Sequence, residues 1–280
     1  MIAPLPDLVL QPLITAALAE DLGRAGDLTS NACVDADARL TGTFAARREG
    51  RIAGLDCVRL AVLTLDPQAT IEMLRRDGDD AAAGAALVRV NANARALLGA
   101  ERTALNLLGR LSGIATLTRA YVRAIEGTDA VITDTRATTP LLRALEKYAV
   151  RCGGAVNHRF GLDDAILIKD NHVAACGGVG EAVRRARAAA GHLVKVEVEI
   201  DRLDQLEEAL AAGPDVVMLD NFAVDAVREA VVRTKGRAVL EASGGVNLQS
   251  VRAIAQTGVS VISVGALTHS APALDVGLDA

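Results

Sequence analysis

Cations and hydrogen-bond donors gather in the stretch from Thr133 to His172. Arg136 follows one apolar run, His158 and Arg159 stand together on a predicted loop, and Lys169 directly follows a second apolar run. Such a group suits a carboxylate or phosphate ligand. An arginine alone is more often a solvated surface charge, so it is the clustering that predicts an anion site.

A second set of candidate residues is acidic. In the run VKVEVEI, Lys195, Glu197 and Glu199 alternate with aliphatic residues, which places three charges on one face of a strand. Charges are costly in a dry core. Glu199 and Asp220 are candidates for Mg²⁺, which prefers oxygen ligands and shares them with substrate phosphates. The alternative is that Lys195, Glu197 and Lys169 neutralise one another.

Glycine-rich segments follow the last two apolar runs, EASGGV at 241–246 and VGAL at 264–267. Backbone N–H groups in such loops, close to the helix predicted over 248–256, form a recurrent phosphate site in barrels. The two segments therefore predict phosphate binding.

These residues need a scaffold, and the second half of the chain indicates one. Apolar runs predict strands over six ranges: 130–133, 165–168, 194–200, 216–219, 238–240 and 259–264. Helical patterns separate them over 179–190, 203–212, 224–234 and 248–256. Parallel β/α units are expected, and the spacing of the last four strands, roughly twenty-two residues, is typical of barrels. An open doubly wound sheet is the alternative, although no G-x-G-x-x-G follows a strand.

The first hundred residues read as a separate α+β unit. Helices are predicted over 12–22 and 58–65, and strands over 40–45, 51–55 and 86–90. A long helix over 92–118, broken or bent near Gly109 and Gly113, carries Arg102 and Asn106 one turn apart on one face. That pair is either a surface pair or part of a site.

Composition limits the class of protein. The net charge of −5 argues against general attraction to nucleic acid. No run of 18 uncharged apolar residues exists, so no membrane span is expected. The four cysteines form no CxxC pair, which argues against a metal site or a disulfide framework. We expect a soluble, cytoplasmic protein with an aliphatic core.

Ordered motifs run through almost the whole chain, in sequence EDLGRAGDLTS, ERTALNLLGRLSGIAT, DTR, EKYAVRCGG, NHR, LIKDNH, VEVE, LDN, EASGG and SVGALTHSAPALD. With these motifs the sequence resembles the quinolinate phosphoribosyltransferases, of the type II phosphoribosyltransferase family. The resemblance implies an α/β protein: an N-terminal α+β open-faced sandwich over 1–113, with 268–280 packing on it, and an incomplete β/α barrel over 114–267. It also implies homodimers with shared active sites, or hexamers.

The implied reaction belongs to NAD biosynthesis. Phosphoribosyl passes from 5-phosphoribosyl-1-pyrophosphate to quinolinate, giving nicotinate mononucleotide, pyrophosphate and CO2. Mg²⁺ is the implied cofactor, with Glu199 and Asp220 as its ligands and Lys169 as a third catalytic residue. Carboxylates and Mg²⁺ suit this chemistry because loss of pyrophosphate leaves an oxocarbenium-like ribose carbon.

The two ring carboxylates of quinolinate need cations, and the 5′-phosphate needs backbone donors. The resemblance assigns the cations to Arg136, His158, Arg159 and Lys169, with Arg102 supplied by the partner subunit. The full implied substrate-binding set is Arg102, Thr135, Arg136, Ala137, His158, Arg159, Lys169, Glu199, Asp220, Ser243, Gly244, Gly245, Val264, Gly265 and Ala266.

Three positions depart from the family pattern. Ala137 and Leu141 stand where DTRKTTPG has lysine and glycine, and Ala155 replaces the third glycine before NHR. A missing cation should weaken binding by about 1.5–3 kcal/mol if it made a charged hydrogen bond. Lys147 and Arg143 are candidate replacements, although both are expected to face solvent.

Three other functions compete with this one. A phosphoribosyltransferase acting on another aromatic acid, or one with weakened activity, is the first, because Ala137 removes a cation. A Schiff-base aldolase that uses Lys169 is the second. A non-catalytic anion-binding homologue is the third.

Overall fold

The computed structural model describes residues 2–280, which divide into two compact units. Unit 1 comprises residues 1–119, 139–154 and 270–280, and unit 2 comprises 120–138 and 155–269. The boundary expected at residue 113 and the division after residue 119 both fall inside the helix Ala94–Ala124.

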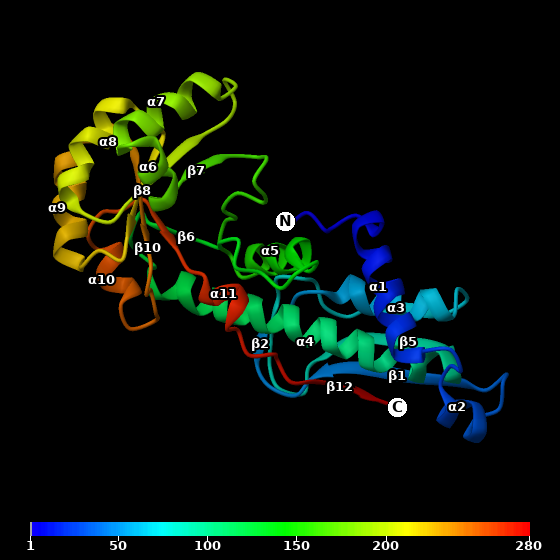
Figure 1. The fold of residues 1–280 in the computed structure, drawn as a ribbon. Helices are drawn as coiled ribbons and strands as arrows, with labels where there is room; N and C mark the ends of the chain where they lie inside the picture. Colours follow the sequence, from blue (N-terminus) through cyan, green and yellow to red (C-terminus); the bar gives the residue numbers. More distant parts are fainter. Residues whose placement is uncertain (1) are drawn as a thin grey trace. The chain divides into compact units, whose positions relative to one another are not determined.

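Unit 1 is built on an antiparallel sheet with strand order β12-β1-β5-β3. Its strands are β1 Arg39–Ala46, β3 Thr70–Met73, β5 Ala86–Asn93 and β12 Val276–Asp279, and a separate pair joins β2 Gly50–Arg51 to β4 Asp80–Ala81. Phe44 of β1 and Val88 and Val90 of β5 are fully buried. In Figure 1 the helices α3 and α4 lie on one side of this sheet. The predicted sandwich is thereby confirmed.

The helices of unit 1 are α1 Asp7–Leu22, α2 Leu28–Cys33, α3 Leu55–Leu65, α4 Ala94–Ala124 and α5 Arg143–Cys152. The strand predicted over 51–55 is wrong beyond Arg51. Gly54 adopts φ 98°, and its N–H and that of Leu55 donate to the Asp77 carboxylate. These contacts begin α3 where a strand was expected.

Of the break or bend predicted near Gly109 and Gly113, the break is wrong, because the long helix α4 is continuous. Both glycines instead admit the C-terminal segment. A Cβ on Gly113 would lie 2.0 Å from the Pro272 carbonyl oxygen, and one on Gly109 would lie 2.9 Å from that of Leu274. The Leu274 N–H also donates to the Gly109 carbonyl. The glycines in α4 thus serve close backbone packing.

Helix α5 packs within unit 1 through a buried carboxylate. Glu146 is fully buried, and its Oε1 accepts from Arg110 Nη2 at 2.8 Å. The Arg110 guanidinium also donates to the Ala271 carbonyl. Lys147, expected to face solvent, is 3% exposed, so that expectation is wrong; Arg143 is half-buried.

Unit 2 contains a parallel six-stranded sheet with order β6-β11-β10-β9-β8-β7. The strands are β6 Val131–Thr133, β7 Ile166–Ile168, β8 Val196–Ile200, β9 Val216–Asp220, β10 Val239–Ser243 and β11 Val261–Ser263. Among the pairings between described strands none joins β6 to β7, so the barrel is incomplete, as predicted.

Short helices connect these strands and lie on their outer side (Figure 1). They are α6 Asp170–Cys176, α7 Val179–Ala189, the 3-10 turn Leu203–Gln205, α8 Leu206–Ala212, α9 Val224–Thr234 and α10 Val251–Ala255. A further short helix, α11 Ala266–His269, follows the last strand of the sheet. Helix α10 is shorter than the predicted 248–256. No helix within residues 2–280 combines the length and apolar character that crossing a bilayer requires.

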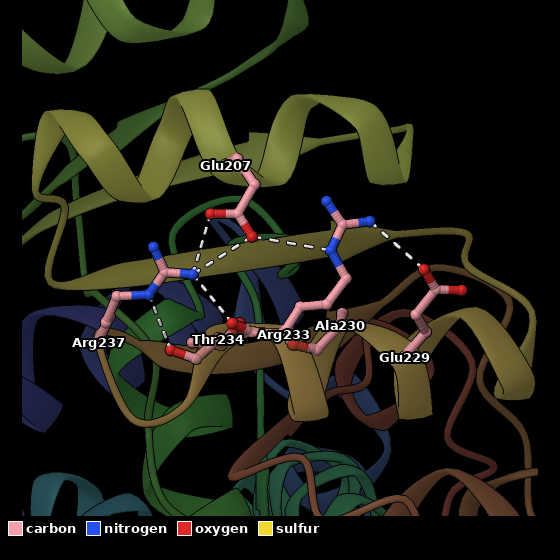
Figure 2. A network of polar contacts seen from close by, with 6 residues as sticks. All are labelled: Glu207, Glu229, Ala230, Arg233, Thr234 and Arg237. Carbon is pink, nitrogen blue, oxygen red and sulfur yellow. Dashed lines mark hydrogen bonds and ion pairs between the residues drawn. The ribbon is translucent and has the colours of Figure 1, made fainter.

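An ion-pair network joins α8 to α9 on the outer surface (Figure 2). Glu207 accepts from Arg237 Nη2 at 3.0 Å and lies 3.7 Å from Arg233 Nε, and Arg233 Nη1 donates to Glu229 at 3.3 Å. The side chains are a third or more exposed. Each such exposed pair contributes about 0–1 kcal/mol to stability, so the network stabilises the scaffold only slightly.

Candidate active site

A cavity of about 400 Å³ lies in unit 2, where the parallel strands end. The side chains that line it come from the six strands, from the loops after them and from the loop before β7: Thr135, Arg136, Ala137, His158, Arg159, Leu167, Lys169, Glu199, Met218, Asp220, Glu241, Ser243 and Ser263. Parallel strands deliver their carboxyl ends to one edge, which explains why residues far apart in sequence meet here.

Asp134 holds the loop that carries His158 and Arg159. It is fully buried, its Oδ1 accepts the His158 backbone N–H at 2.9 Å, and its Oδ2 accepts from Asn157 Nδ2 at 2.7 Å. The Asp of DTR is therefore a positioning residue that fixes the NHR loop.

The guanidinium groups of two arginines, Arg136 and Arg159, lie in the same cavity. The Nε atoms of Arg136 and Arg159 are buried and have no hydrogen-bond partner within residues 2–280. Burial, and then the neighbouring charge of Arg136, lowers the pKa of Arg159. A buried donor without an acceptor is unfavourable, and a bound anion would supply acceptors to both arginines.

Lys169 pairs with Glu199, with Nζ 3.0 Å from Oε2. The predicted alternative, mutual neutralisation of Lys195, Glu197 and Lys169, is wrong: Lys195 reaches Asp215 at 3.4 Å. Lys195 precedes β8 and is largely exposed, so it does not share the cavity face of Glu199. An ammonium held by a carboxylate also argues against the Schiff-base hypothesis, which needs a free amine.

His158 lies between two buried carboxylates. Its Nε2 is 3.1 Å from Glu197 Oε2 and 3.6 Å from Glu241 Oε1, and the three candidate ligand atoms lie within 4.8 Å of one another. The Arg159 backbone N–H donates to His158 Nδ1 at 2.8 Å, so the ring proton belongs on Nε2. A protonated Nε2 cannot ligate a metal, and the group acts as a hydrogen-bonded cluster.

Asn221 ties Asp220 to the glycine loop after β10. It adopts φ 57°, its Nδ2 donates to Asp220 Oδ2 at 2.7 Å, and its backbone N–H donates to the Ser243 carbonyl. A Cβ on Gly244 would lie 2.3 Å from Asn221 Oδ1. The glycine is needed for this close approach as well as for its φ of 85°.

The positions that depart from the family pattern fall in different places. Ala137 lines the cavity, and its carbonyl accepts from Thr268 Oγ1 at 2.7 Å. Leu141 is 91% exposed with φ 67°. Ala155 is buried, next to the bridge between Thr133 and Val156.

The cavity brings together nine predicted site residues: Thr135, Arg136, Ala137, His158, Arg159, Lys169, Glu199, Asp220 and Ser243. Gly244, Gly245, Val264 and Gly265 are outside its described lining and lie on the adjoining loops, and Ala266, also outside the lining, begins α11. Arg102 belongs to unit 1, in a depression of about 270 Å³ shared with Glu20, Asp21 and Asn106.

Sequence reasoning missed Leu167, Met218, Glu241 and Ser263 as lining residues. A signal existed for two of them. Glu241 stands two residues before Ser243 on β10, and Ser263 ends β11. Residues two apart on a strand share a face, so the EASGG acid could have been placed beside the serine.

Comparison with known sequences places this architecture in a family. The model described as the quinolinate phosphoribosyl transferase C-terminal domain matches residues 114–279, and that of the N-terminal domain matches residues 27–112. The chain is 47% identical over 272 residues to the probable nicotinate-nucleotide pyrophosphorylase [carboxylating] of Bacillus subtilis, covering 97% of this chain and 93% of that protein. It is 50% identical over 274 residues to the nicotinate-nucleotide pyrophosphorylase [carboxylating] of Mycobacterium leprae, covering 95% of each.

Solved structures of similar proteins have the same fold. The nicotinate-nucleotide pyrophosphorylase of Francisella tularensis superposes with a TM-score of 0.94 at 40% identity, covering 100% of this chain and 98% of that one. NadC of Streptococcus pyogenes gives a TM-score of 0.96 at 38% identity, with 99% and 98% covered. The fold, the cavity with its ordered motifs and these relatives together mean that the chain belongs to the quinolinate phosphoribosyltransferase family.

Proposed function

We propose that the protein transfers phosphoribosyl from 5-phosphoribosyl-1-pyrophosphate to quinolinate with decarboxylation, giving nicotinate mononucleotide, pyrophosphate and CO2 in NAD biosynthesis. One observation carries the proposal most directly: Arg136 and Arg159 line one cavity, each with a buried Nε that lacks a hydrogen-bond partner within residues 2–280. A planar acid with adjacent carboxylates supplies acceptors to both.

The remaining polar groups suit the pyridine diacid. Lys169 adds a third positive charge at the cavity, and the His158 Nε2–H is a further hydrogen-bond donor. When the ring nitrogen bonds to the ribose carbon it becomes a pyridinium. Its positive charge withdraws electrons from the neighbouring C2–carboxylate bond, which favours the loss of CO2.

Glu199 and Asp220 suit the phosphoribosyl side. Both carboxylates line the same cavity, and the Asn221 amide orients Asp220. We propose that they would hold Mg²⁺, whose charge would stabilise the pyrophosphate leaving group. The carboxylates themselves stabilise the positive charge that develops on the ribose carbon as the pyrophosphate leaves. The N–H donors for the 5′-phosphate would come from the segments that follow β10 and β11, at Ser243, Gly244, Gly245, Val264, Gly265 and Ala266.

Two further parts of the proposal concern the assembly and its location. We propose a homodimer, or a hexamer, in which Arg102 reaches the cavity of the partner subunit. Its exposed position on α4, together with Asn106 in one depression, leaves the guanidinium available to another chain. We propose a cytoplasmic location.

The test is an assay for nicotinate mononucleotide with quinolinate, 5-phosphoribosyl-1-pyrophosphate and Mg²⁺. Nicotinate runs in parallel, and Ala137→Lys runs beside the native chain. Product from quinolinate alone supports the proposal, and the ratio of the two chains' KM values measures the loss from Ala137. A charged hydrogen bond regained would lower KM by about tenfold or more. Product from neither acid, even with Ala137→Lys, contradicts the proposal.

A further inference from the structure

Glu241 is a buried acid that the proposed binding roles leave unused. It lies on β10, lines the cavity and is 4% exposed. Glu197 on β8 and His158 on the NHR loop face it, with His158 Nε2 at 3.6 Å from Glu241 and 3.1 Å from Glu197. Three separate elements thus bring two carboxylates and one imidazole together.

One proton on His158 Nε2 serves this group, because Nδ1 accepts the Arg159 N–H. That proton lies nearer to Glu197. Glu241 Oε1 is buried without a hydrogen-bond partner within residues 2–280. Two buried carboxylates so close together do not both ionise readily, so one retains a proton, and the less well solvated Glu241 is the one to hold it.

The surroundings of Glu241 support that distribution of charge. Burial, and then the charge of Glu197, raises the pKa of Glu241 to about 7, while His158 and the Ser263 hydroxyl act in the opposite direction. Lys169 pairs with Glu199 elsewhere in the cavity lining. Glu241 therefore keeps its proton to a higher pH than an ordinary glutamate does.

We propose, building on the proposed function, that Glu241 is the acid that protonates the ring carbon from which CO2 departs. In the bound quinolinate mononucleotide the bond from C2 to its carboxylate breaks, and the electron pair stays on C2. The O–H bond of Glu241 breaks and a C2–H bond forms, giving nicotinate mononucleotide and leaving Glu241 as a carboxylate. Water returns the proton after product release. Atoms and charge balance without an oxidant or reductant.

The other donors of the cavity suit this step less well. The guanidinium groups of Arg136 and Arg159 do not release protons in proteins, and the His158 Nε2 is already engaged with Glu197 Oε2, 3.1 Å away. Lys169 is half exposed and pairs with Glu199. Glu241 combines a weakly held proton with a position on the cavity wall.

The test separates the two chemical steps in single-turnover rapid-quench experiments on the full chain with Mg²⁺. Quinolinate loss, quinolinate mononucleotide and nicotinate mononucleotide are measured together. In Glu241→Gln, quinolinate is consumed within about threefold of the native rate, whereas formation of the decarboxylated product slows about 100-fold and the intermediate accumulates. Equal product rates in both chains, without accumulation, would overturn the proposal.

A pH series and two further variants guard against a folding defect in Glu241→Gln. The product-forming step of the native chain slows above about pH 7, where Glu241 has lost its proton.

Ser263→Ala removes a hydroxyl that opposes protonation of Glu241, so this decline moves to higher pH. Glu241→Asp retains an acid and recovers part of the rate. An unmoved decline in Ser263→Ala, with no recovery in Glu241→Asp, counts against the role. If the native chain consumes no quinolinate at all, the proposed function has failed at an earlier step.

Discussion

Leu141 adopts a backbone conformation that suits glycine. Its φ of 67° lies in the left-handed region, and its side chain is 91% exposed, so no packing offsets the strain. For a residue with a Cβ this conformation costs roughly 1–2 kcal/mol. Glycine would avoid that cost, but its greater flexibility in the unfolded chain offsets part of the gain.

We expect Leu141→Gly to raise the melting temperature by about 1–3 °C, because the relief of strain exceeds the added flexibility. Thermal unfolding followed by circular dichroism measures it. Leu142→Gly is the matched control: Leu142 has φ −93°, so glycine relieves nothing there and should lower the melting temperature. A fall for both variants would mean that Leu141 is not strained.

The buried acid Glu241 also predicts how stability depends on pH. Its pKa is raised from an ordinary 4.5 to about 7 by burial and by Glu197. The folded state therefore binds the proton more tightly than the unfolded state, and the resulting stabilisation is complete below about pH 4.5 and is lost as pH rises through about 7.

We expect the unfolding free energy of the native chain, relative to Glu241→Gln, to fall by about 1 kcal/mol or more between these pH values and to stay constant above them. Urea unfolding at several pH values measures the difference. Glu229→Gln, which removes a half-exposed carboxylate of α9, controls for the loss of one acidic group. A difference between native and Glu241→Gln that does not change with pH would contradict the assignment.

At the scale of elements, the glycines of α4 show that the same residue type can be required at one position of a helix and replaceable at another. Gly113 lies against the Pro272 carbonyl, whereas a Cβ on Gly99 would meet Leu22 and Leu65 at an ordinary 3.5 Å. Sequence periodicity treats both as weak points of a helix. The structure distinguishes them by what packs against each.

The same substitution should therefore have opposite effects in one helix. Gly113→Ala should destabilise unit 1 by about 1–3 kcal/mol, because its methyl would collide with backbone. Gly99→Ala should stabilise it by about 0.5–1 kcal/mol through helix propensity. Denaturant midpoints of the two variants provide the measurement, and equal signs would show that the contact with Pro272 does not constrain α4.

At the scale of the whole molecule, the proposal of a shared site makes a prediction about mixtures. Arg102 lies in unit 1 and Glu199 in unit 2, and we propose that they serve one active site from different subunits. Arg102→Ala and Glu199→Gln homodimers should each be nearly inactive. In a mixed dimer one site receives both lesions and the other receives neither.

Unfolding and refolding an equal mixture should recover about one quarter of the native activity, because half the dimers are mixed and each has one intact site. The nicotinate mononucleotide assay measures the recovery, and each variant refolded alone is the control. Recovery no greater than the sum of the two variants would place Arg102 and Glu199 in the same subunit's site, or Arg102 in none.

Local pattern by itself determined the order of the β/α units and most of the cavity. The run at 216–219 is observed as β9 Val216–Asp220, and Asp220 stands at its end as predicted. Such features follow from the sequence because strand and helix periods are local, and because parallel strands bring their ends to one edge. The cations Arg136, His158, Arg159 and Lys169 could therefore be predicted to meet.

Only the tertiary structure decided which groups pair. Glu197 meets His158 and Glu241 rather than Lys195, the side chain of Lys147 is buried, and Gly113 admits a backbone segment instead of breaking α4. Each outcome depends on distances between segments remote in sequence, and on burial, which changes the free energy of a charge by more than any local preference does. Residue order determined which groups reach the cavity, and packing decided which of them pair.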